Sequence, residues 1–333
     1  MLRSHIISFA VLASALAACG AAQPATESEA FKTQRCVNMG NALEAPKEGE
    51  WGHKIDLDNF ARIREAGFDT VRFPVRWDAH LAANNLIDPT FLNRVDQVLD
   101  AALAADLDVV LNVHHFDDLM EQPERYSGTL LDIWEQLAYH YQDLPDRVSF
   151  EVLNEPSLAL NGTLLRRLQG DAVRIIRSTN PTRTLILGGE NWSGLNTLGT
   201  NVKLNDPNVV YTFHYYDPFD FTHQKAPWTG PDGPKETRTW GSESDHQKVQ
   251  VDMASAKRFS EDVGRKVFLG EFGAYEAAPE DSRLAYMSAV RREAEAAGIG
   301  WCVWNFTSSF PLFDDDTKTW VPGQLEALDL GAP

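Results

Sequence analysis

Hydrophobic residues in this chain alternate between two kinds of pattern. Short runs of apolar and β-branched residues are separated by longer segments whose apolar positions recur every three or four residues, as on one face of a helix. "FLNRVDQVLDAALAADL" and "GTLLRRLQGDAVRIIRS" are two of these helical segments. The pattern predicts eight strands, at residues 36–39, 70–73, 108–113, 148–152, 184–187, 209–213, 266–270 and 300–303.

Eight strands that alternate with helices, without an internal linker, favour a single α/β domain of the (β/α)8 TIM barrel type. We expect this domain to occupy residues 33–333. The alternative is a doubly wound parallel sheet. It is disfavoured because eight strands are present and because no G-x-G-x-x-G turn follows the first one.

The first residues, "MLRSHIISFAVLASALAAC", have the basic start, apolar centre and small residues of a secretory signal. We expect residues 1–18 to be a signal peptide cleaved before Cys19, with Cys19 lipidated and residues 19–32 forming a flexible tether. The alternative is an ordinary cleaved signal. Either way the protein is predicted to be secreted, and the lipid anchor would place it in the bacterial envelope, with no other membrane contact.

Charge and cysteine content narrow the range of partners. The 333 residues carry a net charge of −18 without a basic cluster, so nucleic acid is not an expected partner. Beyond Cys19 only Cys36 and Cys302 remain, too few for a disulfide framework or a zinc site. They fall on the first and last strands, which are neighbours in a closed barrel. Because a disulfide between neighbouring strands is geometrically awkward, we expect two buried thiols.

Polar side chains recur where the predicted strands end. In "SFEVLNEP" an apolar run stops at Asn154-Glu155-Pro156, and the proline should keep Glu155 extended as the last residue of its strand. The carboxyl ends of all eight strands face one side of a barrel, where its chemistry lies. The other strand ends add Arg72, His114, His115, His214, Tyr216, Glu271 and Trp304.

Two carboxylates that face one pocket can cleave a glycosidic bond. Arg72 should keep Glu271 ionised, as a nucleophile must be. The negative charge of Glu271 should in turn raise the pKa of Glu155, so that Glu155 keeps the proton it donates to the leaving oxygen.

Seven motifs resemble glycoside hydrolase family 5, the cellulase-type retaining enzymes. They run in order from "NMGNALEAPKEGEWG" and "VRFPVRW" through "VHH", "EVLNEP" and "HYYDPFDFTHQ" to "GEFGAY" and "WCVWNF". The resemblance covers roughly residues 33–330 and is strongest to endo-β-1,4-glucanases that also accept mannan. It implies that Glu155 is the acid/base and Glu271 the nucleophile. It further implies that Asn154 binds the sugar 2-hydroxyl, that Tyr216 holds Glu271 and that Trp304 stacks under the sugar.

The same resemblance implies further sugar contacts at Asn41, Glu44, His115, Trp192 and Trp228. The residue after Trp304 tends to be acidic in the relatives, whereas this chain has Asn305, which leaves the sugar preference open. Trp228 and Trp240 fall in a long polar loop, where we expect both to be exposed for sugar stacking.

Several alternatives stay open. The specificity could be that of a β-mannanase or a xyloglucan-type enzyme, or the protein could be a non-catalytic glycan-binding lipoprotein. His114 and His115 could be metal ligands, but the first strand offers no second histidine pair, so neither a metal nor a cofactor is expected. The predicted partner is a β-linked polysaccharide or oligosaccharide, bound by a monomer.

Overall fold

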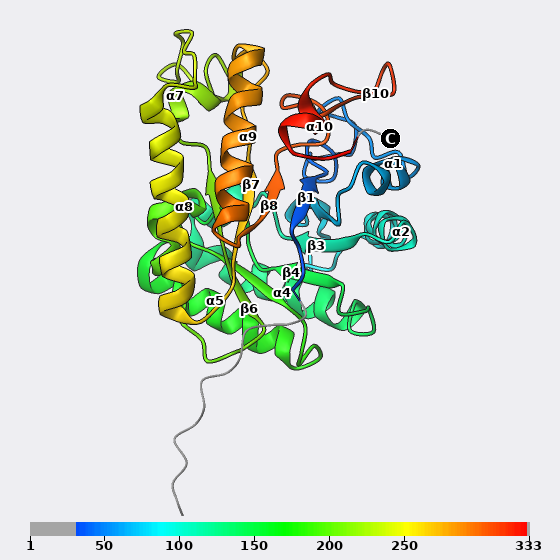
Figure 1. Ribbon diagram of the computed structural model, residues 1–333. Helices are drawn as coiled ribbons and strands as arrows, with labels where there is room; N and C mark the ends of the chain where they lie inside the picture. The colour runs from blue at the N-terminus through cyan, green and yellow to red at the C-terminus, as the bar shows by residue number, and fades with distance from the viewer. Residues whose placement is uncertain (1–30, 332–333) are drawn as a thin grey trace, which may run out of the picture.

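The computed structural model describes residues 31–331, and their strands close into one parallel barrel (Figure 1). Each strand pairs with the next in the chain, and β8 pairs with β1 to complete the ring. The predicted (β/α)8 barrel is therefore confirmed. The barrel strands are β1 Arg35–Asn38, β2 Thr70–Phe73, β3 Asp108–Asn112, β4 Val148–Glu151, β5 Leu185–Gly188, β6 Val209–Tyr215, β7 Val267–Phe272 and β8 Gly300–Val303.

Helices surround the barrel and bury their apolar faces against it, while the small antiparallel pair β9 (Phe313–Asp314) and β10 (Thr319–Trp320) lies beside α10 (Figure 1). Helix ends follow capping rules. Ser242 and Asp245 form a capping box at the start of α8, and Gly264 ends that helix in the left-handed conformation. The α-helices are α1 Asn59–Glu65, α2 Pro89–Ala104, α3 Asp117–Glu121, α4 Pro123–His140, α5 Gly162–Arg177, α6 Glu190–Ser193, α7 Phe219–Thr222, α8 Glu243–Val263, α9 Glu280–Ala296 and α10 Gln324–Ala327; the short 3-10 helices are η1 Asp78–His80, η2 Leu195–Thr200 and η3 Pro227–Thr229.

The amino end of the barrel interior is closed by apolar side chains. Phe31, predicted to belong to the tether, is buried there and packs edge-on against Phe268. The rest of this cluster consists of Cys36, Val110, Ile186, Val210 and Cys302. Its members come from six strands around the ring, so they meet inside the barrel.

Cys36 and Cys302 form a disulfide, so the prediction of two free thiols was wrong. The parallel register of β1 and β8 places the two residues directly opposite each other, with their Cα atoms 4.1 Å apart. Both side chains point into the barrel, where they meet. The bond joins residues 266 positions apart in sequence and closes the ring covalently between its first and last strands.

The fourth strand ends earlier than predicted. β4 stops at Glu151, and Glu155 lies in the following loop with a φ of 47°, not in an extended conformation. The backbone N–H of Asn154 still donates to Val113 of the neighbouring strand segment, and the N–H of Trp192 donates to Pro156. These bonds hold the loop across the barrel mouth and fix the unusual backbone of Glu155.

Among residues 31–331, no helix has both the length and the apolar character that crossing a bilayer requires.

Candidate active site

Arg72 lies at the centre of a buried network at the barrel mouth. Its guanidinium donates to both oxygens of Glu151, at 2.6 and 2.7 Å, and to Oε1 of Glu271 at 2.8 Å. It also donates to the side-chain oxygens of Asn38 and Asn154, each at 2.7 Å. Burial opposes the charge on Arg72, but Glu151 and Glu271 raise its pKa above the usual value. Arg72 is therefore a permanent cation that orients four accepting side chains around the site.

Glu151 and Asn38 belong to this network, although the sequence analysis did not assign them a role. The side chains of both residues point into the barrel, because residues two apart along a strand face the same side. Glu151 shares the inward face of β4 with Ser149, and Arg72 occupies the equivalent face of β2. A pair of opposite charges inside two apolar strands was the signal that could have revealed this contact.

Glu271 is held through both of its oxygens. Arg72 donates to Oε1, and the Tyr216 hydroxyl donates to Oε2 at 3.0 Å. Burial raises the pKa of Glu271, while His214 and Arg72 act in the opposite direction. Burial and the neighbouring carboxylates raise the pKa of Tyr216 well above its usual value, so its hydroxyl keeps the proton that it donates. The predicted contacts of Glu271 with Arg72 and Tyr216 are confirmed.

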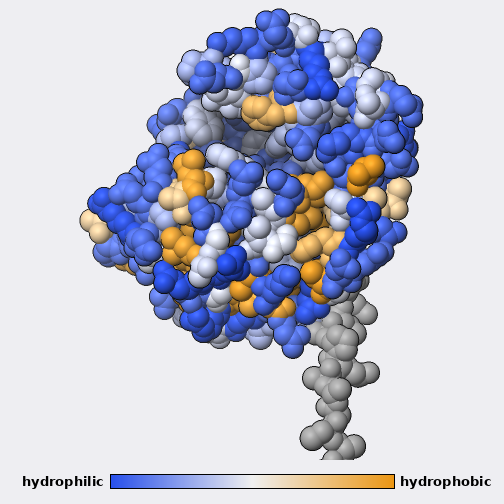
Figure 2. All heavy atoms as spheres, turned by 90° about the vertical axis from the view of Figure 1, so that its left-hand side faces the viewer, coloured by the Kyte–Doolittle hydropathy of each residue, from blue (hydrophilic) through white to orange (hydrophobic). Residues whose placement is uncertain are grey.

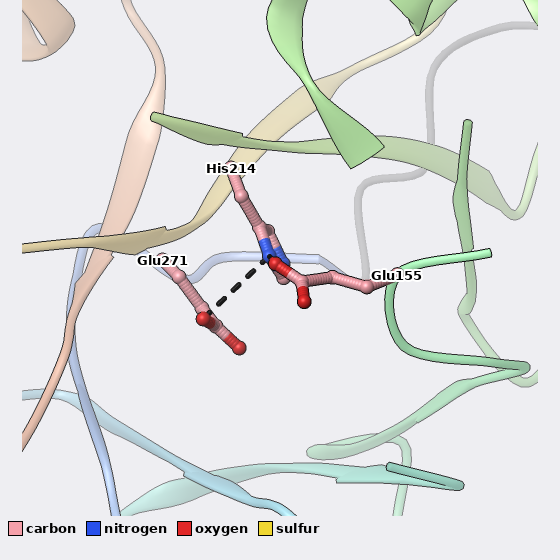
Figure 3. Close-up of side chains that lie close together, drawn as sticks. All are labelled: Glu155, His214 and Glu271. Carbon is pink, nitrogen blue, oxygen red and sulfur yellow. Dashed lines mark hydrogen bonds and ion pairs between the residues drawn. The ribbon is translucent and has the colours of Figure 1, made fainter. Parts of the chain in front are cut away.

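Glu155 faces Glu271 across His214 (Figure 3). The Nδ1 atom of His214 lies 2.7 Å from Oε1 of Glu155 and 3.6 Å from Oε2 of Glu271. One oxygen from each glutamate lies within 4.8 Å of the other. This separation is shorter than the ~6.5–9.5 Å typical of inverting glycosidases and agrees with the short spacing of retaining ones.

The pKa of Glu155 is raised to about 7, mainly because the carboxyl group is buried. Arg72 lowers this pKa and Glu151 raises it. The direction of the shift agrees with the prediction, but its main cause is burial rather than the charge of Glu271.

The neighbouring histidines are neutral polar groups. Burial, with His115, Arg72 and His214, lowers the pKa of His114 well below its usual value, and burial lowers that of His115 to about 4. His114 stacks against Trp304, with ring centroids 5.6 Å apart. The amide of Asn112, another residue that the sequence analysis did not single out, lies 3.0 Å from Nδ1 of His114. Amide Nδ2 of Asn154 lies 3.5 Å from the other ring nitrogen.

The loop after β1 adds another buried carboxyl group. Glu44 accepts the backbone N–H groups of Asn41 and Ala42, and burial raises its pKa to about 7. The amide of Asn305 donates to the side-chain oxygen of Asn41 at 2.8 Å. This contact brings the residue after Trp304 into the same cluster as Asn41 and Glu44.

Gly40 explains how Trp304 fits beside this loop. A Cβ atom at position 40 would lie only 2.8 Å from the Trp304 ring, closer than side chains tolerate. The glycine therefore allows the indole to lie against the backbone at the mouth.

Exposed aromatic residues line the rim. Trp192 and Trp228 are 51% and 52% exposed, whereas Trp240 is only 6% exposed, so the predicted exposure of Trp240 was wrong. Trp240 is covered by helices α8 and α9, where it packs against His246 and Tyr286. Rim aromatics outside the predicted set are Trp51 beside His115, and Phe219, His223 and Tyr275 around Tyr216 and Trp228, with the buried Phe310 packed against them.

Glu155, His214 and Glu271 also form the one cluster among residues 31–331 whose geometry could hold a metal ion. The existing contacts of Glu271 fit a cation poorly, because its two oxygens already accept from the charged Arg72 and from Tyr216. The arrangement is better suited to proton transfer and nucleophilic attack, which require one protonated and one ionised carboxyl group.

A parallel barrel with two closely spaced carboxyl groups at its mouth has the arrangement of an enzyme that cleaves glycosidic bonds. Residues 27–309 match the family described as "Cellulase (glycosyl hydrolase family 5)". The chain belongs to this family, as its motifs predict.

Named relatives agree with this assignment. Endoglucanase H of Acetivibrio thermocellus is 34% identical over 304 residues, which cover 88% of this chain and 32% of the relative. The chain therefore spans about a third of that relative's length. Crystal structures of Thermotoga maritima Cel5A with cellobiose and with mannotriose are 39% and 38% identical, with TM-scores of 0.86 and 0.87. Each covers 89% of this chain and 97% of the solved one.

Proposed function

We propose that the protein is a retaining, endo-acting β-1,4-glucanase. The observation that carries this proposal is the pair Glu155 and Glu271, whose oxygens approach within 4.8 Å in different surroundings. Glu271 is bound by a cation and a hydroxyl donor, whereas the pKa of Glu155 is raised to about 7. At neutral pH one carboxyl group is therefore suited to attack and the other to donate a proton.

The reaction has two steps. A Glu271 oxygen attacks the anomeric carbon, the bond to the leaving oxygen breaks, and that oxygen takes the proton of Glu155. The resulting glycosyl ester removes the negative charge of Glu271. Glu155, now ionised, accepts a proton from water as the water oxygen attacks the anomeric carbon, and the ester bond breaks. The sugar is released with its original configuration, and both glutamates return to their starting states.

Glucan is the preferred substrate in this proposal, with glucomannan also accepted and xylan a poor substrate. Solved relatives bind cellobiose and mannotriose, which supports a site that admits both gluco- and manno-configured sugars. The two sugars differ at the 2-hydroxyl, the group that Asn154 would contact. A dedicated β-mannanase or a xyloglucan-type specificity on the same mechanism remains the alternative.

Reducing ends and viscosity should be measured together on barley β-glucan, carboxymethylcellulose, glucomannan, galactomannan, xyloglucan and xylan. An endo-acting glucanase lowers the viscosity of β-glucan long before most bonds are cut. Glu271→Gln is the matched control, because it keeps the shape of the side chain but cannot attack. Xylan or galactomannan as clearly the best substrate would contradict the glucanase proposal, and binding of glucan without turnover would favour a non-catalytic binder.

We also propose that the protein is secreted and anchored through a lipidated Cys19, a residue outside the described part of the chain. Phe31, where that part begins, packs at the amino end of the barrel, whereas Glu155 and Glu271 lie at the carboxyl end. An anchor before Phe31 would leave the mouth facing away from the membrane. Palmitate labelling, lost in Cys19→Ala, tests the anchor, and light scattering tests whether the soluble domain is a monomer.

A further inference from the structure

The loop after β5 has an unusual backbone at the barrel mouth. Asn191, Trp192 and Ser193 have φ angles of 54°, 56° and 53°, so three consecutive residues adopt the left-handed conformation. None of them is a glycine, and in residues other than glycine this conformation normally occurs at single positions. A left-handed turn of this length persists only where its surroundings hold it in place, and such segments cluster at functional sites.

Hydrogen bonds on both sides hold this left-handed turn. Before it, the carbonyl of Glu190 accepts from the Thr197 hydroxyl at 2.6 Å, and the Glu190 carboxylate accepts from the N–H of Gly162 at 2.7 Å. After it, the N–H of Gly194 donates to the carbonyl of Asn191 at 3.2 Å. The turn is therefore fixed to its own loop and to the start of α5.

The turn is also bonded to the two elements that hold the general acid. The N–H of Trp192 donates to the carbonyl of Pro156, the residue after Glu155, at 3.0 Å. Gly194 pairs as a parallel bridge with His214, whose Nδ1 atom lies 2.7 Å from Oε1 of Glu155. Glu155 itself has a φ of 47°, so its backbone also needs support from outside its loop. The turn therefore supports Glu155 both through its backbone and through the partner of its carboxyl group.

Asn191 is the residue of this turn whose backbone preference can be changed without disturbing a side-chain contact. Its side chain is exposed, and no described residue forms a hydrogen bond with it. Polar surface side chains of this kind are common on the protein, as the largely hydrophilic face in Figure 2 shows. Asparagine adopts the left-handed conformation more readily than other residues except glycine, whereas a β-branched residue is strongly disfavoured there.

We propose that Asn191 is a positioning residue for the general acid Glu155. Its left-handed backbone begins the turn that presents the N–H of Trp192 to Pro156, and this bond fixes the loop that carries Glu155. The carboxyl group is thereby held in the position from which it gives its proton to the leaving oxygen. The assignment of Glu155 as the acid rests on the proposed function.

Two aryl cellobiosides separate proton donation from the rest of the reaction. The leaving group of the dinitrophenyl glycoside needs no proton, whereas that of the phenyl glycoside does. In Asn191→Val we expect kcat/KM to fall roughly tenfold or more on the phenyl glycoside and on β-glucan, but less than about twofold on the dinitrophenyl glycoside. Asn191→Gly should keep native values on all three substrates, because glycine adopts the left-handed backbone without steric cost.

The ratio of kcat/KM on the two aryl glycosides is the informative quantity. Both values are measured on the same sample, so their ratio does not depend on the fraction of the protein that is folded. Loss of contact between the aryl group and Trp192 would lower both values alike and leave the ratio unchanged. Asn191→Ala is a milder change for use if the valine variant does not fold, and its ratio should change in the same direction.

Asn85→Val is the matched control. Asn85 also has a left-handed backbone, with a φ of 60°. Its side chain, however, donates to Asp132 at 2.8 Å, and its carbonyl accepts from Gln136 at 2.9 Å, both on α4. Among the described residues, Asn85 forms no hydrogen bond with the loop that carries Glu155. The control should therefore lose stability in urea unfolding without a change in the ratio.

The outcomes separate the two proposals. An unchanged ratio in Asn191→Val, whether both values fall or neither does, would overturn the positioning role and leave the glucanase proposal intact. Equal changes in Asn191→Gly and Asn191→Val would also overturn it, because the backbone conformation would then not be the cause. The predicted change of ratio in a protein that hydrolyses no β-glucan would support the role of Asn191 but contradict the proposed function.

Discussion

At the amino end of the barrel interior, the strands contribute apolar side chains and the Cys36–Cys302 disulfide, whereas at the carboxyl end they contribute Arg72, Glu151 and Glu271. The amino end can be close-packed because no ligand has to enter it. The carboxyl end buries the charges of Arg72, Glu151 and Glu271. Buried ion pairs of this kind contribute little net stability even when their hydrogen bonds are complete, because removing the charges from water is costly. The comparison indicates that the closed end contributes net stability, whereas the buried charges of the open end serve reactivity and become costly when one partner is removed.

The largest expected effect follows from removing one carboxylate of the mouth. Glu151→Gln takes away the charge that pairs with both Nε and Nη2 of Arg72, and breaking a buried pair costs about 3–5 kcal/mol. Because Arg72 also orients Glu271, we expect kcat to fall together with stability. Urea unfolding and kinetics on β-glucan measure the two effects.

Glu48→Gln is the matched control for this change. Glu48 forms a similar two-oxygen pair with Arg94, but this pair is partly exposed and lies outside the Arg72 network. The control should lose less stability and keep its kcat. Equal effects in the two variants would contradict a special role for Glu151.

A second prediction concerns the closed end. Replacing Cys36 and Cys302 by alanine should lower the free energy of unfolding by about 2–5 kcal/mol, because the bond closes a long loop. Kinetic constants at a temperature where the variant is folded should not change, since the bond lies at the other end of the barrel. A loss of kcat in this variant, with an unchanged free energy of unfolding, would contradict the assignment of net stability to the closed end and of catalysis to the open end.

The pH dependence tests the protonation states at the mouth. Glu155 must be protonated to act as the acid, and its pKa is raised to about 7, so kcat/KM should fall about tenfold per pH unit above that value. Glu271 must be ionised to attack, and burial raises its pKa. On the acidic side of the profile, kcat/KM should therefore begin to fall at a pH above the usual pKa of a glutamate.

The alkaline limb can be assigned with two variants and an aryl glycoside whose leaving group needs no proton. With the native enzyme the limb should be absent from kcat/KM on this substrate, because formation of the ester no longer needs the proton of Glu155. Glu155→Gln should therefore change kcat/KM little on the aryl glycoside, although it should abolish turnover of β-glucan. Glu44 also has a pKa raised to about 7, so Glu44→Gln must keep the limb on β-glucan if Glu155 is responsible. The opposite result would assign the limb to Glu44.

The smallest expected effect is that of metal removal. Dialysis against EDTA should leave the rate on β-glucan nearly unchanged, because the oxygens of Glu271 are already bound by Arg72 and Tyr216. A loss of activity that zinc or calcium restores would mean that Glu155, His214 and Glu271 hold a metal ion.

Strand positions and the residues at strand ends could be predicted from local patterns. The alternation of short apolar runs with helical segments predicted the barrel. The polar residues at the ends of these runs included Arg72, Glu155 and Glu271, which the structure brings together. Such predictions succeed because strand direction and the closed topology place all carboxyl ends on one side.

Features that depend on register and long-range packing could not be predicted in the same way. The Cys36–Cys302 bond follows from the register of strands at opposite ends of the chain. The burial of Trp240 follows from the packing of α8 and α9 over a loop of polar composition. The left-handed backbone of Glu155 depends on hydrogen bonds to the ends of other strands, which override the local effect of Pro156.

The roles of the two glutamates can be tested most directly by the stereochemistry of azide rescue. In Glu271→Ala, azide should enter the space left by the carboxylate and convert an activated β-glycoside into the inverted α-glycosyl azide. In Glu155→Ala, the ester with Glu271 can still form from an activated substrate, so azide should give the retained β-glycosyl azide. Both variants should lose several orders of magnitude of turnover on polysaccharide. Exchange of the two products between the variants, or near-native polysaccharide turnover in either, would contradict the assignment.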